Sequence, residues 1–124
     1  MNVTEYNARK SELGVTASGI NSKAKRELKW KDGSITAEGT PVHIDFCETR
    51  PGRIYVTVGE TVYQTGLVNR ANERFTGIGK PPGLRTLEKY SSDGIAKTVT
   101  GEKTEPDGFG SNGAPSWMLV VGII

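Results

Sequence analysis

The stretch HIDFC holds the three residue types from which a nucleophilic or metal-binding site could be assembled. His43, Asp45 and Cys47 alternate with apolar residues, so on a β-strand they lie on one face. Positions i and i+2 of a strand lie ~6.5–7 Å apart, whereas a nucleophile and its base must approach within ~2.6–3.2 Å. This spacing excludes direct contact between Cys47 and His43 on a regular strand, and as a set of metal ligands the trio is incomplete because it lacks a fourth group nearby. We interpret the trio as a polar sheet face.

A second candidate for chemistry is FTGIGKPPG, which combines glycines with Lys80 as phosphate-binding loops do. It lacks the GxxxxGK[ST] spacing of such loops. Pro81 and Pro82 also occupy the place of the helix N-terminus that would hold the anion. We therefore interpret this stretch as a turn that leads into a helix, and we expect no nucleotide site.

The most basic stretch is KAKRELKWK. Residues 1–31 hold seven Lys and Arg against three Glu, whereas the other 93 residues hold nine basic and eleven acidic side chains. Such a cluster attracts phosphates through counterion release, and an aromatic side chain within it can stack on a base. Basic arms are also common on proteins that bind no nucleic acid. The cluster supplies our candidate contacts for a partner or for nucleic acid: Lys23, Lys25, Arg26, Lys29, Trp30 and Lys31.

Three further side chains bear on this choice of partner. Exposure of Arg53, Tyr55 and Tyr63 on one side of the protein would favour binding of nucleic acid. The alternation of apolar residues predicts instead that Tyr63 is buried.

The size and composition of the chain indicate one small domain. A chain of 124 residues is too short for two independent cores, and an apolar fraction of 35% with 16 glycines favours short strands joined by turns. One cysteine excludes an internal disulfide, and the net charge of +2 indicates no particular partner. No apolar run approaches the ~20 residues that span a bilayer, and no secretory signal is recognisable. We expect a protein of the bacterial cytoplasm, with virion association left open.

The elements that must position these residues differ between the two ends of the chain. Residues 1–28 are expected to form a basic, weakly structured arm with a short helix capped by Thr4, and residues 29–124 a single domain. Residues 34–68 predict an antiparallel meander, in which SITAEGTPVHIDF is one strand and Gly59-Glu60 turns a hairpin. That hairpin pairs Val58 with Thr61, Val56 with Tyr63 and Ile54 with Thr65.

The second half of the chain predicts shorter elements. NRANERFTGIGK is expected to be a loop with one edge strand, and residues 83–91 a helix across the sheet that Asp93-Gly94 ends. IAKTVTGEKTE predicts a short strand or hairpin. In the tail, Ser116 can cap a helical turn from Trp117 to Val121 that stops at Gly122, with Ile123 and Ile124 folding back. A terminal strand is the alternative, because the tail is rich in β-branched residues.

The residues from Leu84 to Ile124 carry a resemblance. Their pattern, a TLEK-like helix, DG, EPDG, a glycine-rich interval and PSW before an apolar ending, resembles the C-terminal part of small uncharacterised proteins encoded by bacteriophages and prophage-like elements. Members of that group often place Cys and His around the glycine-rich loop, which suggests zinc. This chain has Ala96, Phe109 and Asn112 in the corresponding stretch, so the resemblance implies an origin and no metal site.

These observations lead to one expectation for the whole chain. We expect an α+β fold, a small antiparallel β-meander with one or two short helices and an N-terminal arm. The expected function is that of a non-enzymatic accessory protein of a phage or mobile element, without a cofactor, that binds a host factor, a defence component or virion subunits. The alternative is a nucleic-acid-binding accessory protein that uses the basic cluster. An enzyme using His43 or Cys47, and a self-assembling virion component, are further alternatives.

Overall fold

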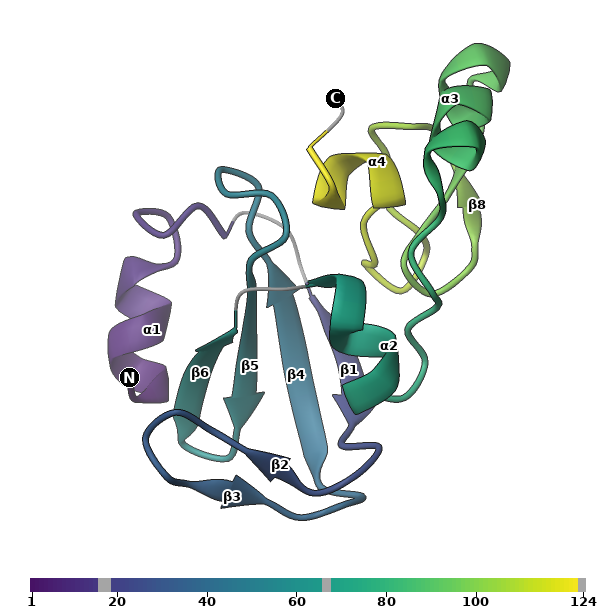
Figure 1. The fold of residues 1–124 in the computed structure, drawn as a ribbon. Coiled ribbons are helices and arrows are strands. Elements are labelled where there is room, and N and C mark those ends of the chain that lie inside the picture. Colours follow the sequence, from purple (N-terminus) through teal and green to yellow (C-terminus); the bar gives the residue numbers. More distant parts are fainter. Residues whose placement is uncertain (16–18, 66–67, 123–124) are drawn as a thin grey trace.

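A four-stranded antiparallel sheet forms the centre of the protein. The computed structural model describes residues 1–15, 19–65 and 68–122. The sheet has the order β1-β4-β5-β6, with β1 (Ile20–Lys23) and β6 (Thr61–Thr65) at its edges and β4 (Pro41–Phe46) and β5 (Ile54–Val58) inside (Figure 1). Together with the helices described below, this sheet confirms the predicted α+β fold.

The sheet buries side chains on both faces, because β4 and β5 alternate two sets of residues. Val42, Ile44 and Phe46 of β4 belong to the larger core, which also takes Ile54 and Val56 from β5. The opposite face carries a second, smaller cluster of Tyr6, Val15, Cys47, Tyr55 and Val62. The β5–β6 hairpin has the predicted register, with Val56 opposite Tyr63. The face that we predicted to be merely polar is therefore half apolar and covered.

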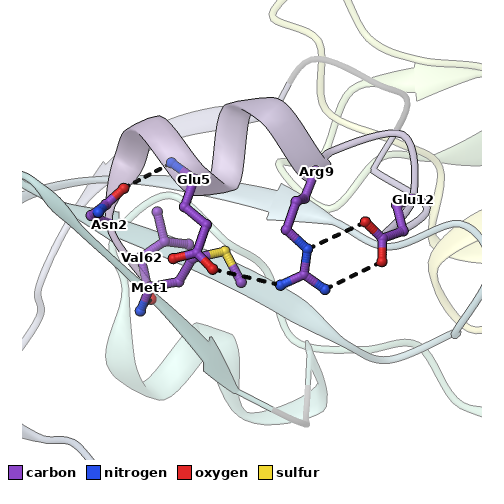
Figure 2. Close-up of polar contacts among 6 residues, drawn as sticks. All are labelled: Met1, Asn2, Glu5, Arg9, Glu12 and Val62. Atoms are coloured by element: carbon purple, nitrogen blue, oxygen red, sulfur yellow. Dashed lines mark hydrogen bonds and ion pairs between the residues drawn. The ribbon is translucent and has the colours of Figure 1, made fainter.

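Residues 1–28 differ from the weakly structured arm that we expected. Helix α1 (Val3–Arg9) is capped by Asn2, not Thr4, and ion pairs join Arg9 to Glu5 and Glu12 (Figure 2). Tyr6 anchors α1 on the sheet and is 2% exposed. Strand β1, from the same segment, pairs with β4 over four residues. The basic, polar composition concealed these anchors, because the buried residues of the segment, which include Tyr6, Val15, Ile20 and Leu28, are too widely spaced to form a periodic pattern.

The stretch that we predicted as one strand, SITAEGTPVHIDF, forms two. Strand β2 (Leu28–Lys29) pairs with β3 (Ile35–Thr36) in a separate two-stranded hairpin, and the chain then turns into β4. Gly39, with φ of 82°, lies in this turn, where its amide donates to the Ala24 carbonyl. The meander of the main sheet therefore begins at Pro41, and β1 extends it as a fourth strand.

The segment after β6 is helical where a loop with one edge strand was expected. A short 3₁₀ helix, η1 (Val68–Arg70), continues into α2 (Ala71–Arg74). Phe75 follows, 1% exposed, and forms an isolated bridge with Ala24. The apolar residues of this segment are too few for a periodic pattern, so burial of Ala71 and Phe75 decides its structure.

The next helix, α3 (Leu84–Asp93), ends at Gly94 as predicted, with φ of 70°. It does not lie across the main sheet. It packs on β7 (Ala96–Lys97), which forms the predicted hairpin with β8 (Lys103–Thr104), and Figure 1 shows α3 and β8 beside each other away from the sheet. Leu87 is buried and Tyr90 packs partly buried against the same core, whereas Leu84 is 68% exposed.

The tail forms the predicted helical turn, α4 (Trp117–Val120). The Ser116 hydroxyl accepts the Met118 amide at 3.0 Å and donates to the Pro106 carbonyl at 2.6 Å. Trp117, Met118 and Val120 are buried, and the Gly52 amide donates to the Val120 carbonyl. Ile123 and Ile124 lie outside the described residues. In the part of the chain that the structure covers, no helix has the length and apolar character needed to cross a membrane.

Candidate functional site

A groove lies between the β2–β3 hairpin and the edge strand β6. Its volume is about 700 Å³, and it is lined by Met1, residues 26–32, residues 62–65 and Arg74. We call it the β2–β6 groove. Figure 1 shows the hairpin along the end of the sheet at which β5 turns into β6. The groove thus brings most of the basic cluster next to an edge strand.

A stacked aromatic pair holds the hairpin against the sheet. The rings of Trp30 and Tyr63 lie 4.3 Å apart between centroids and 4° from parallel. The Trp30 indole donates to the Thr36 hydroxyl at 2.8 Å. Tyr63 is half-buried because Trp30 covers it, which corrects the prediction of a buried tyrosine. The half-buried pair lines the groove beside its charged side chains.

The groove lining carries more positive than negative side chains. Arg26, Lys29, Lys31 and Arg74 contribute four positive charges, and Glu27 and Asp32 contribute two negative ones. The Ser34 amide donates to the Asp32 carboxylate at 2.8 Å and holds the pKa of that carboxyl below its usual value. Asp32 therefore remains charged, and the groove combines an excess of positive charge with acidic positions.

Four of the six candidate contacts from the sequence line this groove: Arg26, Lys29, Trp30 and Lys31. The other two lie elsewhere. Lys23 is at the end of β1, and the Lys25 ammonium donates to the Asn72 carbonyl at 3.0 Å, beside α2. Arg74 and Gln64 also line the groove and were not predicted, because each is an isolated polar residue far from the cluster in sequence.

Two residues of the groove direct backbone groups away from their own sheets. The amide of Val62 donates to the Met1 carbonyl, on the side of β6 away from β5. In an antiparallel pair, every second residue directs its amide and carbonyl to that outer side, so the backbone groups of Gln64 also point away from β5. In the hairpin, the amide of Trp30 donates to the Ser34 carbonyl, so the backbone groups of Lys29 point away from β3. Among the described residues, no backbone hydrogen bond satisfies these groups of Gln64 or Lys29.

The polar trio of β4 takes part in a different arrangement, centred on the buried Asp45 carboxylate. Asp45 is 1% exposed and accepts a 2.6 Å hydrogen bond from the Tyr6 hydroxyl. His43 Nε2 lies 3.2 Å from Asp45 Oδ1, and Lys10 Nζ lies 3.9 Å from Asp45 Oδ2, the oxygen that also accepts from Tyr6. His43 Nδ1 is 2.8 Å from the Asn21 side-chain oxygen. The cluster thus links α1, β1 and β4.

The surroundings of Asp45 keep it ionised. Burial by itself would raise the pKa of Asp45, but the hydrogen bonds from His43 and Tyr6 and the charges of His43 and Lys10 outweigh burial and hold it below its usual value. Burial of Tyr6, reinforced by its hydrogen bond to Asp45, raises the pKa of the phenol. A neutral phenol that donates to a buried carboxylate is a stabilising contact.

The same geometry tests the catalytic interpretation of HIDFC. His43 and Asp45 do meet, because their side chains bridge the spacing between strand positions. Cys47 does not join them, since its buried thiol lies 3.2 Å from the Leu13 carbonyl and 3.5 Å from the Thr49 hydroxyl. The described residues hold no group of three or more His, Cys, Asp or Glu that could bind a metal ion.

The glycine-rich stretches have structural partners. In the phosphate-loop-like segment, the Gly79 amide donates to the Val99 carbonyl, which ties this turn to the β7–β8 hairpin. In the C-terminal loop, the Glu102 carboxylate accepts hydrogen bonds from the Ser111 amide and hydroxyl. These contacts account for both stretches as turns of the fold.

Comparison with known proteins adds no relative to these observations. No protein-family model matches the chain, and no curated protein or solved structure matches it significantly.

Proposed function

We propose that the chain is a non-enzymatic binding protein that acts by holding a partner protein in the β2–β6 groove. The observation that carries this proposal is the groove itself. It joins the stacked Trp30–Tyr63 pair to Arg26, Lys29 and Lys31 at an open strand edge. Aromatic and arginine side chains that border a concave surface are typical of protein interfaces.

The buried cluster favours binding over catalysis. Asp45 is inaccessible, and its partners Tyr6 and His43 are engaged in hydrogen bonds within the fold. The Cys47 thiol is also buried and lies against a carbonyl rather than a base. A nucleophilic mechanism needs an accessible nucleophile within reach of its base, and these residues do not supply that pair.

The proposal is tested by capture with matched charge reversals. The wild-type protein, a Lys29→Glu/Lys31→Glu variant and an Arg85→Glu/Lys89→Glu variant are immobilised and exposed to bacterial lysate. All four side chains are exposed, and the last two lie on α3, outside the groove. The captured protein is then purified and its affinity for each variant measured by calorimetry.

We expect the groove variant to lose at least about tenfold in affinity, because it replaces two attractive charges at the interface with repulsive ones. The α3 variant, which has the same net charge, should bind as the wild type does. Equal affinity of the two variants for the partner would contradict the proposal.

The resemblance of residues 84–124 supports a phage or mobile-element origin, and we propose a host factor, a defence component or a virion subunit as the class of partner. The neighbouring genes test this origin, because tail, capsid, replication and anti-defence genes cluster by role. A position among housekeeping genes in several genomes would contradict it.

Nucleic acid is the second candidate ligand, and the four basic side chains of the groove lining favour it. Binding of single- and double-stranded oligonucleotides at two salt concentrations tests it. A phosphate-binding groove should show affinity that falls steeply with salt and is lost in the Lys29→Glu/Lys31→Glu variant. Absence of binding at low salt would remove this candidate.

A further inference from the structure

The open edge of β6 suggests how the groove recognises its partner. The outward amide and carbonyl of Gln64 lack a backbone partner among the described residues, and Gln64 is exposed. Unpaired edge groups are a template for an additional strand. A peptide backbone presents donors and acceptors in alternation and can satisfy both groups, whereas a phosphate backbone offers acceptors only.

The first half of β6 already shows this pairing. Asn2 forms an antiparallel bridge with Thr61, in which the Val3 amide donates to the Glu60 carbonyl and the Val62 amide donates to the Met1 carbonyl. The edge of β6 is therefore geometrically able to accept an antiparallel segment. This pairing ends at Val62, two residues before Gln64, and both of these residues line the groove.

The charges beside the edge specify the chemistry of the segment. Lys29 and Lys31 are exposed on the hairpin, and Arg26 and Arg74 complete the basic lining. Side chains of an added strand point alternately to the two faces of the sheet. Acidic side chains at every second position of the added strand would lie on the face that carries this lining. The apolar side chains between them would lie on the opposite face of the sheet.

We propose that the β2–β6 groove binds an extended acidic segment of a partner protein as an additional β-strand, paired with the edge of β6 at Gln64 beside Lys29 and Lys31. This inference rests on the proposed function and names its mode of recognition and the chemistry of the partner. Main-chain hydrogen bonds supply affinity in this mode, and the alternate side chains supply specificity.

Selection from a library of random twelve-residue peptides tests the inference, with counter-selection against the Lys29→Glu/Lys31→Glu variant. We expect enrichment of peptides that carry Asp or Glu at alternate positions. Backbone N-methylation of such a peptide should lower its affinity at least about fivefold at residues that donate to β6, since each position loses one hydrogen bond. Methylation of the intervening residues should change it less than twofold.

Two measurements on the protein locate the peptide. The Gln64 amide should exchange with deuterium at least about tenfold more slowly when the peptide is bound. Gln64→Pro, which removes the outward amide, should weaken binding at least about fivefold, whereas Gln64→Ala, which keeps it, should not. If Gln64→Pro fails to fold, the methylation pattern and the exchange rate decide the question.

The outcomes separate this inference from the proposed function. If selected peptides bind in the groove but tolerate methylation at every position and leave Gln64 exchange unchanged, the strand mode is wrong while binding of a partner in the groove stands. Failure to enrich acidic peptides, pairing of two copies of the chain through β6, or displacement of the peptide only by oligonucleotides would each overturn the inference. The capture experiment decides separately whether the proposed function is wrong.

Discussion

The Tyr6 hydroxyl donates a 2.6 Å hydrogen bond to the buried Asp45 carboxylate, and this contact joins α1 to the centre of the sheet across 39 residues of sequence. Tyr6→Phe should therefore lower the free energy of unfolding by about 1–3 kcal/mol, because Asp45 loses a donor where water cannot replace it. Urea denaturation measures the change. Tyr90→Phe is the control, since the Tyr90 hydroxyl makes no hydrogen bond to another described residue. Equal changes in the two variants would contradict a special role for Tyr6.

Asp45 should make the free energy of unfolding depend on pH in the acidic range. Its folded pKa lies below the unfolded value of about 3.9, so the unfolded chain takes up this proton at a higher pH than the folded protein does. The stabilisation is thus present above the unfolded pKa and is lost as the pH falls through the folded pKa. The free energy of unfolding should fall as the pH drops below about 5. Denaturation of Asp45→Asn over the same pH range should give a shallower slope, and identical slopes would count against this account.

The stacked pair should hold the β2–β3 hairpin in place. Tyr63→Ala removes the ring against which Trp30 packs at 4.3 Å, so we expect a loss of about 1–3 kcal/mol in the free energy of unfolding. Trp30 should become more solvated, with red-shifted fluorescence. Tyr63→Phe keeps the ring and should change the unfolding free energy by less than about 0.5 kcal/mol. A wild-type emission maximum in Tyr63→Ala would show that the hairpin is held by other contacts.

Gly19 should not tolerate a side chain. A Cβ atom there would overlap the Ile44 carbonyl and the Asp45 carboxylate, and the Ile44 backbone belongs to a central strand that cannot move aside. Gly19→Ala should cost more than about 2 kcal/mol of unfolding free energy or prevent folding. Gly79→Ala is the control, because its Cβ would meet only the Val99 carbonyl at 3.6 Å, an ordinary contact. Comparable thermal midpoints for the two variants would contradict the close approach of Gly19 to Ile44 and Asp45 of β4.

Local signals in the sequence predicted several elements well. The alternation over residues 41–46 and 54–65 predicted the central strands and the register of their hairpin. Gly94 was expected to end α3, and Ser116 to cap α4. In each case the deciding interaction lies within a few residues along the chain, so residue type and spacing are enough to recognise it.

Interactions across long stretches of sequence were not predictable in this way. The sequence suggested an arm where α1 and β1 dock, because the partners of Tyr6 and of β1 are on β4. It also placed Lys23, Lys25 and Arg26 of the basic cluster on that arm, whereas the structure sets Trp30 against Tyr63 and Arg26 near Arg74 in one groove. Such pairs are chosen by the shape and burial of the whole core, for which no local pattern exists.

The sequence by itself therefore determined the class of fold, the central hairpin, the caps of the C-terminal helices and the residue types of the candidate contacts. Only the tertiary structure decided which contacts share a surface, that Asp45 is a buried structural carboxylate, and that Gln64 lies on an open edge. The physical reason is that propensities and turn chemistry act between neighbours, whereas burial and strand pairing join residues that are distant in sequence.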